Sequence, residues 1–191
     1  MKKIIVIGCP GSGKSYFSKK LSEILNIPKY HLDCIYWKEN WAPTSKEVFI
    51  EKIKDILSQD NYIIDGNYNS TLRIRFESCD TIYFLDMPTQ ICIDSIIFRT
   101  GKKREDLPDY LTEDGNIEEF LELVKNFNET KRNNIINLIE EYKHKNIIVF
   151  KDREEVNQYL LNLKASIKWY DLWNIVNIQD KTTTYNFNRK L

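Results

Sequence analysis

The residues most suited to chemistry in this 191-residue chain lie in one glycine-rich stretch near its start. Residues 8–15 read GCPGSGKS and match the pattern G-x-x-x-x-G-K-[ST]. In this pattern the glycines let backbone N–H groups point inward around a phosphate, the lysine reaches the β- and γ-phosphates, and the final hydroxyl ligates Mg²⁺. The stretch therefore predicts binding of a nucleotide's phosphates. The predicted contact residues are Gly8, Cys9, Pro10, Gly11, Ser12, Gly13, Lys14, Ser15 and Tyr16.

The segments on either side of this loop are those that a phosphate-binding loop requires. Residues 3–7 are an apolar, β-branched run typical of a buried strand. Phe17, Leu21 and Leu25 then recur at helical spacing, which predicts a helix over about 14–25. The N-terminus of such a helix attracts anions. A glycine-rich turn that only joins a strand to a helix is the alternative, and the flanking elements favour phosphate binding over it.

The rest of the chain alternates apolar runs with amphipathic segments. Further strands are expected over 29–32, 62–64, 81–85 and 146–150, with helices over 45–58, 71–77, 89–100, 117–143 and 154–163. Thr44 and Glu47 form a capping-box pattern before the helix over 45–58. This alternation predicts an α/β fold with a five-stranded parallel sheet covered on both faces. Ligands bind such sheets at the carboxyl ends of the strands.

Two aspartates follow expected strands at that end of the sheet. Asp65 comes beside the phosphate loop, where it would hold Mg²⁺ directly or through water, or else only cap its own loop. Asp33 follows the neighbouring strand, where it would accept a proton from an acceptor hydroxyl or bind the acceptor, or else only form a turn. Tyr36 and Trp37 come next and would stack on a planar substrate or form a hydrophobic wall, and both interpretations stay open. His31 is expected to pack.

Arginine is the scarcer basic residue, with seven among the 28 Lys and Arg side chains, and five of the seven fall between residues 73 and 132. A guanidinium binds phosphate oxygens bidentately and stays charged, which suits phosphoryl transfer. We expect a lid over about 101–116, with Arg99, Arg104 and Arg132 closing over the transferred phosphoryl group. The alternative is solvated surface charge, which fits Arg73 best.

Composition narrows the class of protein. The chain carries 28 basic and 28 acidic side chains, so no net charge draws it towards nucleic acid or an anionic membrane. No apolar run approaches the roughly 20 residues of a membrane span, and the expected location is the cytoplasm. The four cysteines lack C-x-x-C spacing, which favours reduced thiols over a zinc site. Cys9 lies inside the phosphate loop, although that position alone does not make a thiolate.

Several motifs together resemble a known family, the adenylate-kinase-like P-loop kinases, and more narrowly the bacterial DNA topology modulation (FlaR-like) proteins. The resemblance covers about residues 1–163. The motifs that carry it are GCPGSGKS, HLD (31–33), YW (36–37) with Trp41, IIDGNY (63–68) with Thr71, Leu72 and Arg75, FLDMP (84–88), RTGKKR (99–104) and Arg132. Adenylate kinases read DGFPR where this chain reads DGNYN (65–69), so the acceptor arginine of that segment has no counterpart here.

The resemblance implies a three-layer P-loop NTPase fold of the nucleotide-monophosphate-kinase type, with a helical lid and with ATP and Mg²⁺ as ligands. The function that we expect is transfer of the γ-phosphoryl group of ATP to a small acceptor such as a nucleotide or nucleoside. The alternative is an ATP-binding regulatory protein with little or no turnover. Residues expected on the acceptor side are Asp33, Tyr36, Trp37, Asp65, Gly66, Asn67, Tyr68 and Arg75. The expected kinase domain is 1–163, followed by an extension over 164–191 that packs on the domain or contacts a second copy in a homodimer.

Overall fold

The structure is a computed structural model, and it describes residues 1–102, 107–108 and 117–169. The chain divides into two compact units, Met1–Arg153 and a second unit that starts at Glu154. Most of the lid predicted over 101–116, including Arg104, lies outside the described residues. The predicted domain boundary at residue 163 stays a prediction.

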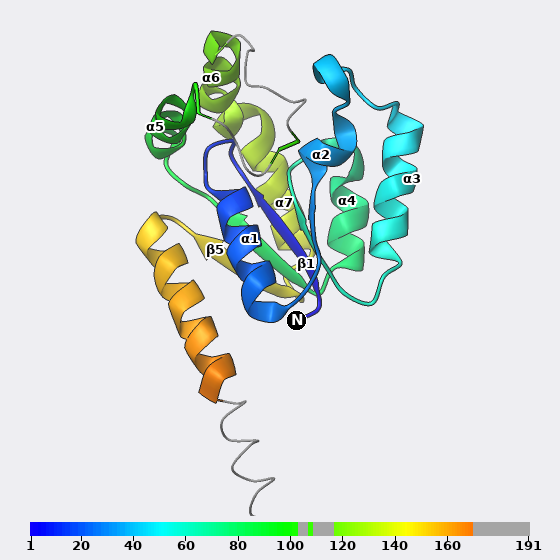
Figure 1. Cartoon of the computed structure of the whole chain (residues 1–191), viewed down its shortest axis with the longest axis vertical. Coiled ribbons are helices and arrows are strands. Elements are labelled where there is room, and N and C mark those ends of the chain that lie inside the picture. Colours follow the sequence, from blue (N-terminus) through cyan, green and yellow to red (C-terminus); the bar gives the residue numbers. More distant parts are fainter. Residues whose placement is uncertain (103–106, 109–116, 170–191) are drawn as a thin grey trace, which may run out of the picture. The chain divides into compact units, whose positions relative to one another are not determined.

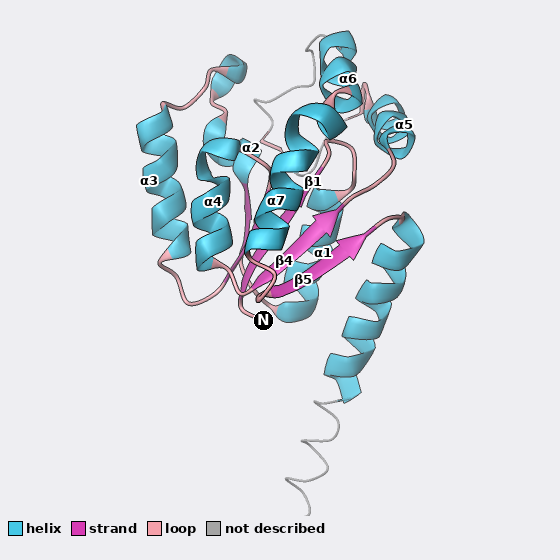
Figure 2. Ribbon diagram, turned by 180° about the vertical axis from the view of Figure 1, so that it is seen from behind, coloured by secondary structure: helices cyan, strands magenta, loops and turns pink. Residues whose placement is uncertain are grey.

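The first unit is built on a five-stranded parallel sheet, as predicted. Its strands are β1 (Lys3–Gly8), β2 (Lys29–His31), β3 (Tyr62–Asp65), β4 (Thr81–Leu85) and β5 (Asn146–Phe150). The strand order is β2-β3-β1-β4-β5, which places β1 at the centre between β3 and β4. The labelled strand arrows in Figure 2 point towards the end of the sheet that carries α5 and α6. The loop after β1 therefore opens at the carboxyl edge, where this class of sheet binds ligands.

Helices cover both faces of the sheet, which makes three layers. α1 (Lys14–Leu25) lies on one face, and α4 (Asn69–Ser78) and α7 (Asn133–Glu141) lie on the other, as the two opposite views show (Figures 1 and 2). The remaining helices are α2 (Leu32–Tyr36), η1 (Glu39–Trp41), α3 (Lys46–Leu57), α5 (Thr89–Arg99), α6 (Ile117–Lys125) and η2 (Asn128–Arg132). α3 packs beside α4, and α5 beside α6.

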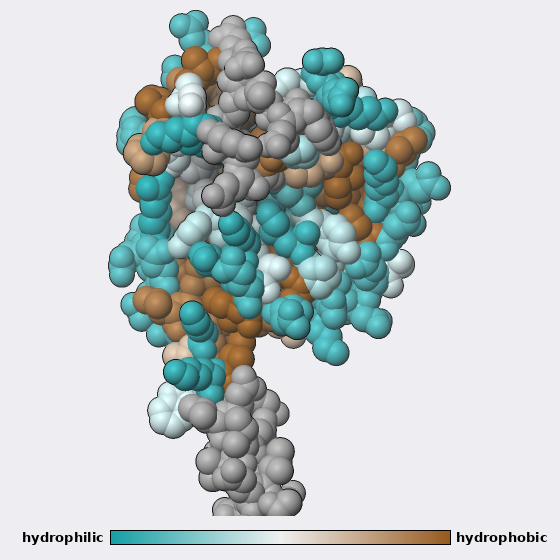
Figure 3. Space-filling view, in the orientation of Figure 1, coloured by the Kyte–Doolittle hydropathy of each residue, from teal (hydrophilic) through white to brown (hydrophobic). Residues whose placement is uncertain are grey.

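The core follows from the near-continuous apolar strands. Every residue of β1 from Ile4 to Ile7 is fully buried, because helices cover the strand from both faces. Phe17 of α1 packs edge-to-face on Tyr83 of β4, with 4.8 Å between ring centroids. Apolar surface remains at the end that carries α5 and α6, where Ile97, Phe98 and Leu123 are exposed (Figure 3).

Three local expectations were wrong. Asp33 does not end a strand but lies in the first turn of α2, with its carbonyl accepting a hydrogen bond from the Trp37 N–H at 3.0 Å. The N-cap of α3 is Ser45, whose hydroxyl accepts from the Val48 N–H, because the Thr44 hydroxyl donates instead to the Ile35 carbonyl. The expected helix over 117–143 is interrupted between α6 and α7.

The interruption is the π-helical stretch η2. The carbonyl of Asn126 accepts the regular helical hydrogen bond from the Thr130 N–H at 3.0 Å and a second one from the Thr130 hydroxyl at 2.8 Å. Such π-helical turns inside α-helices are frequent at functional sites, and this one ends at Arg132.

The described part of the second unit is helical. A helix runs over residues 153–169, longer than the predicted 154–163. The expected amphipathic continuation at Tyr170, Trp173 and Val176 lies outside the described residues. Within the described ranges, we find no helix with the length and apolar character needed to cross a membrane.

Candidate functional site

The loop over residues 8–15 has the backbone of a phosphate cradle. Gly8, Gly11 and Gly13 have φ values of 152°, 81° and 94°, which L side chains rarely adopt. A Cβ on Gly8 would lie 2.5 Å from the Leu85 carbonyl oxygen, and one on Gly11 would lie 2.3 Å from the Cys92 carbonyl oxygen. A Cβ on Gly13 would meet nothing within 4 Å. The first two glycines thus seat the loop on β4 and α5, while the third faces open space.

Gly13 is also the N-cap of α1, and it provides no side-chain cap. The first turn of α1 contains no acidic residue, so the positive end of the helix dipole is not neutralised within the helix. The hydroxyl of Ser12 is buried and has no hydrogen-bond partner in the structure. An anion at this helix start would be favoured by the helix dipole and by polar groups of the loop.

Lys14 begins α1 and folds back over the loop. Its Nζ donates to the carbonyl of Cys9 at 2.9 Å. Burial lowers the pKa of Lys14 from its usual value, while the carboxylate of Asp65 acts in the opposite direction. This lysine lies within the loop that would hold the phosphates, as the motif predicts. Tyr16 follows on α1 with a side chain that is 54% exposed, and the contact predicted there stays a prediction.

The hydroxyl of Ser15 lies beside an imidazole. Ser15 Oγ is 3.5 Å from His31 Nε2, and His31 Nδ1 is 2.6 Å from Asp65 Oδ1. The other carboxylate oxygen of Asp65 accepts a 2.5 Å hydrogen bond from Ser18, one turn after Ser15 on α1. Burial alone would raise the pKa of Asp65, but the hydrogen bond and the charge of His31, the hydrogen bond from Ser18 and the charge of Lys29 lower it overall.

Asp65 itself is fully buried. Ser18 donates a hydrogen bond to Oδ2, and Oδ1 lies 2.6 Å from His31 Nδ1. The role predicted for Asp65, holding Mg²⁺ directly or through water, stays a prediction. His31 itself was expected only to pack. The signal that could have identified it is strand register, because His31 and Asp65 are paired residues of β2 and β3.

Asp33 lies on the other side of His31. Its Oδ2 is 3.7 Å from His31 Nε2, and its Oδ1 accepts a 2.7 Å hydrogen bond from the Tyr68 hydroxyl. Burial, followed by the charge of Asp33, raises the pKa of Tyr68, which therefore keeps its proton. The structure thus brings the predicted residues Ser15 and Asp33 to one imidazole, with Tyr68 bonded to Asp33.

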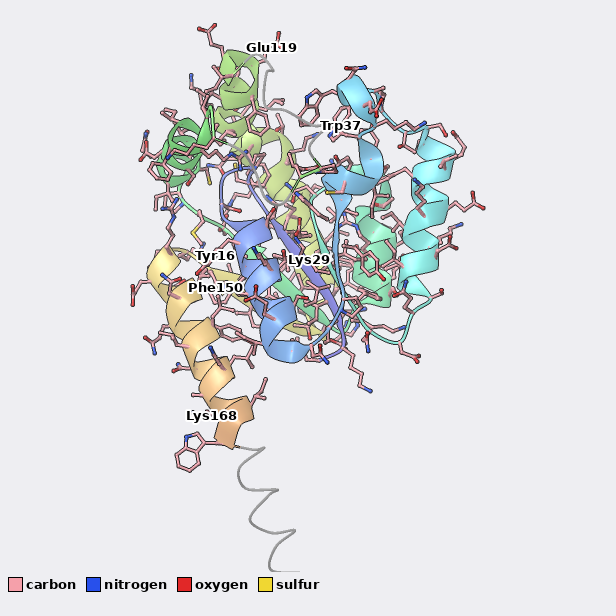
Figure 4. The ribbon with its side chains drawn as sticks, viewed as in Figure 1. Tyr16, Lys29, Trp37, Glu119, Phe150 and Lys168 are labelled. Atoms are coloured by element: carbon pink, nitrogen blue, oxygen red, sulfur yellow. The ribbon has the colours of Figure 1, made fainter. Side chains whose placement is uncertain are left out.

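Aromatic rings continue from this point. Tyr36 lies 4.8 Å from Tyr68, 5.1 Å from Phe49 and 4.7 Å from Trp37 between ring centroids. Trp37 in turn contacts Trp41 at 5.7 Å, and Figure 4 shows Trp37 beside α2. Tyr36 and Trp37 are therefore parts of an aromatic cluster next to Asp33, and both are partly exposed.

Two residues expected to bind the acceptor instead fix the loop after β3. The side chain of Asn67 hydrogen-bonds the backbone of Gly8. Gly66 has a φ of 129°, and a Cβ there would lie 2.8 Å from the side chain of Leu32, so this glycine permits close packing. Their predicted place on the acceptor side stays a prediction.

Arg75 is the third expected acceptor residue that the structure places elsewhere. Its side chain is fully buried on α4. The guanidinium donates to the backbone carbonyls of Gly66, Asn67, Tyr68 and Thr71. Burial lowers its pKa to about 9, which still leaves the group charged at neutral pH. Because its guanidinium donates to four backbone carbonyls, Arg75 supports the loop that carries Asn67 and Tyr68.

The three arginines predicted to belong to the lid differ in their positions and contacts. Arg132 makes a bidentate pair with Asp86, with both nitrogen–oxygen distances 2.7 Å, and Lys151 adds a contact to Asp86 at 2.8 Å. Arg99 ends α5 and lies 5.9 Å from the ring of Phe120. Arg104 lies outside the described residues. In this structure Arg132 therefore binds a carboxylate at the end of β4.

Cys9 is buried within the loop. Its thiol contacts Cys92 of α5 and lies 4.0 Å from the carbonyl of Val124. The hydrogen bond with Cys92 and then burial raise the pKa of Cys9 well above the usual range. The thiol is therefore protonated at neutral pH. The contact of Cys9 with Lys14 is made by its backbone carbonyl.

Comparisons with known proteins agree with this architecture. No family model matches the sequence. The adenylate kinase of Thermosipho africanus (strain TCF52B) is 29% identical over 106 residues, which are 52% of this chain and 48% of the relative. That of Pseudothermotoga lettingae is 28% identical over 116 residues, 57% of this chain and 52% of the relative. The chain thus spans about half the length of the curated relatives that it matches.

Among solved structures, that of shikimate kinase from Bacteroides thetaiotaomicron matches with a TM-score of 0.50 and 16% identity. The match covers 86% of this chain and 97% of that chain. At this identity the likeness concerns the fold. The sheet order, the glycine loop and these similarities together identify the fold as that of the P-loop kinases.

Proposed function

We propose that this protein is an ATP-dependent phosphotransferase that acts on a small acceptor such as a nucleotide, a nucleoside or a similar metabolite. The observation that carries the proposal is the position of one imidazole nitrogen. His31 Nε2 lies 3.5 Å from the Ser15 hydroxyl of the phosphate loop and 3.7 Å from a carboxylate oxygen of Asp33. A single side chain, His31, thus lies between the loop that would bind ATP and a carboxylate suited to an acceptor hydroxyl.

The loop residues fit ATP and Mg²⁺. The free N-terminus of α1, the open space at Gly13 and the partnerless hydroxyl of Ser12 provide donors and room for phosphate oxygens. Lys14 would move from the Cys9 carbonyl to the β- and γ-phosphates, and the hydroxyl of Ser15 would ligate the metal. Mg²⁺ bound with ATP neutralises charge on the transferred group.

On the acceptor side, Asp33 would hydrogen-bond the attacking hydroxyl and accept its proton. Tyr68 orients this carboxylate through its 2.7 Å hydrogen bond, and the rings of Tyr36 and Trp37 offer a surface for a planar acceptor. Arg99, Arg104 and Arg132 would close over the phosphoryl group, which for Arg132 requires exchanging Asp86 for phosphate.

The test is release of ADP in a coupled assay with ATP, Mg²⁺ and a panel of nucleotides, nucleosides and other small alcohols. One acceptor should stimulate release at least about 10-fold over the rate without acceptor, and Lys14→Ala should abolish that stimulation while preserving the circular dichroism spectrum. Lys20→Ala is the matched control, because Lys20 is on the same helix and pairs with Glu23 at the surface. Stimulated turnover by Lys14→Ala at the wild-type rate would remove the mechanism.

The same assay tests the alternative, an ATP-binding regulatory protein of the topology-modulation type. Slow hydrolysis that no acceptor accelerates would support that function and contradict ours. Homodimer formation and a cytoplasmic location stay predictions from the sequence.

A further inference from the structure

Two buried thiols from separate elements of the first unit meet beside the phosphate loop. Cys9 is the second residue of the loop, and Cys92 is the fourth residue of α5. The two side chains are hydrogen-bonded to each other, and both are buried. The proposed phosphoryl transfer uses neither thiol, so the pair needs an explanation of its own.

The backbone around Cys9 connects this pair to the residues that would bind phosphate. Its carbonyl accepts hydrogen bonds from the Ser12 N–H at 3.1 Å and from Lys14 Nζ at 2.9 Å. Two residues further on, a Cβ on Gly11 would lie 3.1 Å from Cys92 Cα and 2.3 Å from the Cys92 carbonyl oxygen. The loop is therefore packed directly on the backbone of Cys92, and a displacement of Cys9 would be passed on to Ser12 and Lys14.

The two sulfurs differ in chemical character. Cys9 donates to Cys92, which raises the pKa of the Cys9 thiol and lowers that of Cys92. Burial opposes the lowering at Cys92, while the positive charges of Lys14 and Arg153 add to it. A position in the first turn of a helix also favours a thiolate. Cys92 is thus the better nucleophile, and Cys9 is a protonated thiol in contact with it.

We propose that Cys9 and Cys92 are a redox modification site, at which hydrogen peroxide forms a disulfide that closes the phosphate loop to ATP. The thiolate sulfur of Cys92 attacks one peroxide oxygen and the O–O bond breaks, which leaves a sulfenic acid and a hydroxide ion. The sulfur of Cys9 then attacks the sulfur of Cys92, and the hydroxyl group leaves with the Cys9 proton as water. The hydroxide takes up the proton that Cys92 had lost, so two thiols and one peroxide give one disulfide and two waters.

The effect on the loop follows from the length of the new bond, and this part of the inference rests on the proposed function. Bonded sulfurs are about 2.05 Å apart, much closer than two hydrogen-bonded thiols. Cys9 would be drawn towards α5, although Gly11 already has no space against the carbonyl of Cys92. The loop must then change shape, and the N–H groups and Lys14 would no longer converge on the phosphates.

The experiment treats the full-length protein with hydrogen peroxide and compares it with protein kept in dithiothreitol. Peptide mass spectrometry without reduction should find the peptides of Cys9 and Cys92 linked, with two hydrogens lost. Calorimetric titration with ATP and Mg²⁺ should show affinity reduced about 10-fold, the equivalent of one or two lost hydrogen bonds to phosphate. Dithiothreitol added after the peroxide should restore the wild-type affinity.

Serine variants assign the effect to this pair. Cys92→Ser and, separately, Cys9→Ser should bind ATP equally well before and after peroxide, and either variant that keeps the wild-type circular dichroism spectrum suffices. Cys34→Ser and Cys79→Ser are the controls, because Cys34 is partly exposed and Cys79 is buried elsewhere in the fold. Both controls should respond to peroxide as the wild type does.

Peroxide treatment that oxidises Cys34 without linking Cys9 to Cys92 would overturn the inference. A linked pair with unchanged ATP affinity would overturn the closure of the loop, and a response that Cys34→Ser abolished would assign the modification to Cys34 instead. The linked peptide is measured without ATP and without turnover. A reduced protein that bound no ATP would contradict the proposed function and the closure, whereas the mass spectrum would still decide whether the disulfide forms.

Discussion

The side-chain amide of Asn67 makes two hydrogen bonds with the backbone of Gly8. Its Nδ2 donates to the Gly8 carbonyl at 2.7 Å, and its Oδ1 accepts from the Gly8 N–H at 3.1 Å. Gly8 is the first residue of the phosphate loop, and Asn67 belongs to the loop after β3, which also carries Tyr68. The pair therefore links the loop after β1 to the loop after β3 through two hydrogen bonds.

Replacing Asn67 with Ala should loosen the phosphate loop. Two partly buried hydrogen bonds are lost, and at roughly 0.5–1.5 kcal/mol each the variant should unfold about 1–3 kcal/mol more easily. Binding of ATP should weaken as well, because the amides of the loop would no longer be held in place. Urea unfolding and calorimetry measure the two effects. Asn69→Ala is the control, since Asn69 is exposed at the start of α4, and a loss of the same size there would refute the clamp.

Arg75→Lys should destabilise the fold rather than alter acceptor recognition alone. Lysine is a point donor and cannot serve four carbonyls arranged around a planar guanidinium. Leaving buried carbonyls without donors costs roughly 1–3 kcal/mol each, so we expect a loss of about 2–4 kcal/mol in urea unfolding.

Arg73→Lys provides the matched comparison on the same helix. Arg73 is exposed and pairs with Glu141, and surface pairs of this kind contribute about 0–1 kcal/mol. If Arg75→Lys were as stable as Arg73→Lys and changed only the KM for the acceptor, Arg75 would be a substrate ligand after all.

Much of the fold could be predicted because it depends on local patterns. The buried runs before Gly8 and Asp86 and the motif ending at Ser15 gave three of the elements at the carboxyl edge within a residue or so. The short helix α2 could not be found in this way. It is too short for a periodic signal, and packing of Tyr36 on Phe49 helps to hold it.

The roles of single side chains were harder to predict than their neighbourhood. Asn67 and Asp65 have partners far along the chain, whereas the carbonyl partners of Arg75 are four to nine residues before it. Sequence identifies which chemical groups arrive at an edge, whereas the partners of each group depend on register and on loop conformation. His31 illustrates the difference, because its contact with Asp65 follows from the pairing of β2 with β3.

Alkylation should spare the cysteine of the phosphate loop. The hydrogen bond with Cys92 and then burial raise the pKa of Cys9, and only the thiolate reacts quickly. Cys34 is more exposed than Cys9, Cys79 and Cys92. With iodoacetamide at neutral pH we expect Cys34 to be modified first and Cys9 much more slowly, as followed by peptide mass spectrometry. Rapid labelling of Cys9 in the folded protein would contradict this assignment.

Asp86 should stabilise the folded protein in a pH-dependent way. Burial would raise the pKa of this carboxyl, but the hydrogen bonds and charges of Arg132 and Lys151 lower it overall from the ordinary value of 3.8. A carboxyl with a lower pKa in the folded state contributes its full stabilisation above the unfolded value, and this contribution is lost as the pH falls through the folded value. Asp86→Asn should therefore cost roughly 1.5–3 kcal/mol at pH 7, and this difference from the wild type should shrink below about pH 4.

Urea unfolding at pH 7 and again near pH 3 measures the difference directly. Asp94→Asn serves as the control for removing a carboxylate, because Asp94 is exposed on α5 and accepts a hydrogen bond from Gln90 one turn earlier. That surface change should alter stability by no more than about 0.5 kcal/mol at pH 7. A cost for Asp86→Asn that stayed the same at both pH values would mean that the loss comes from packing, and that the ion pairs with Arg132 and Lys151 contribute little to folding.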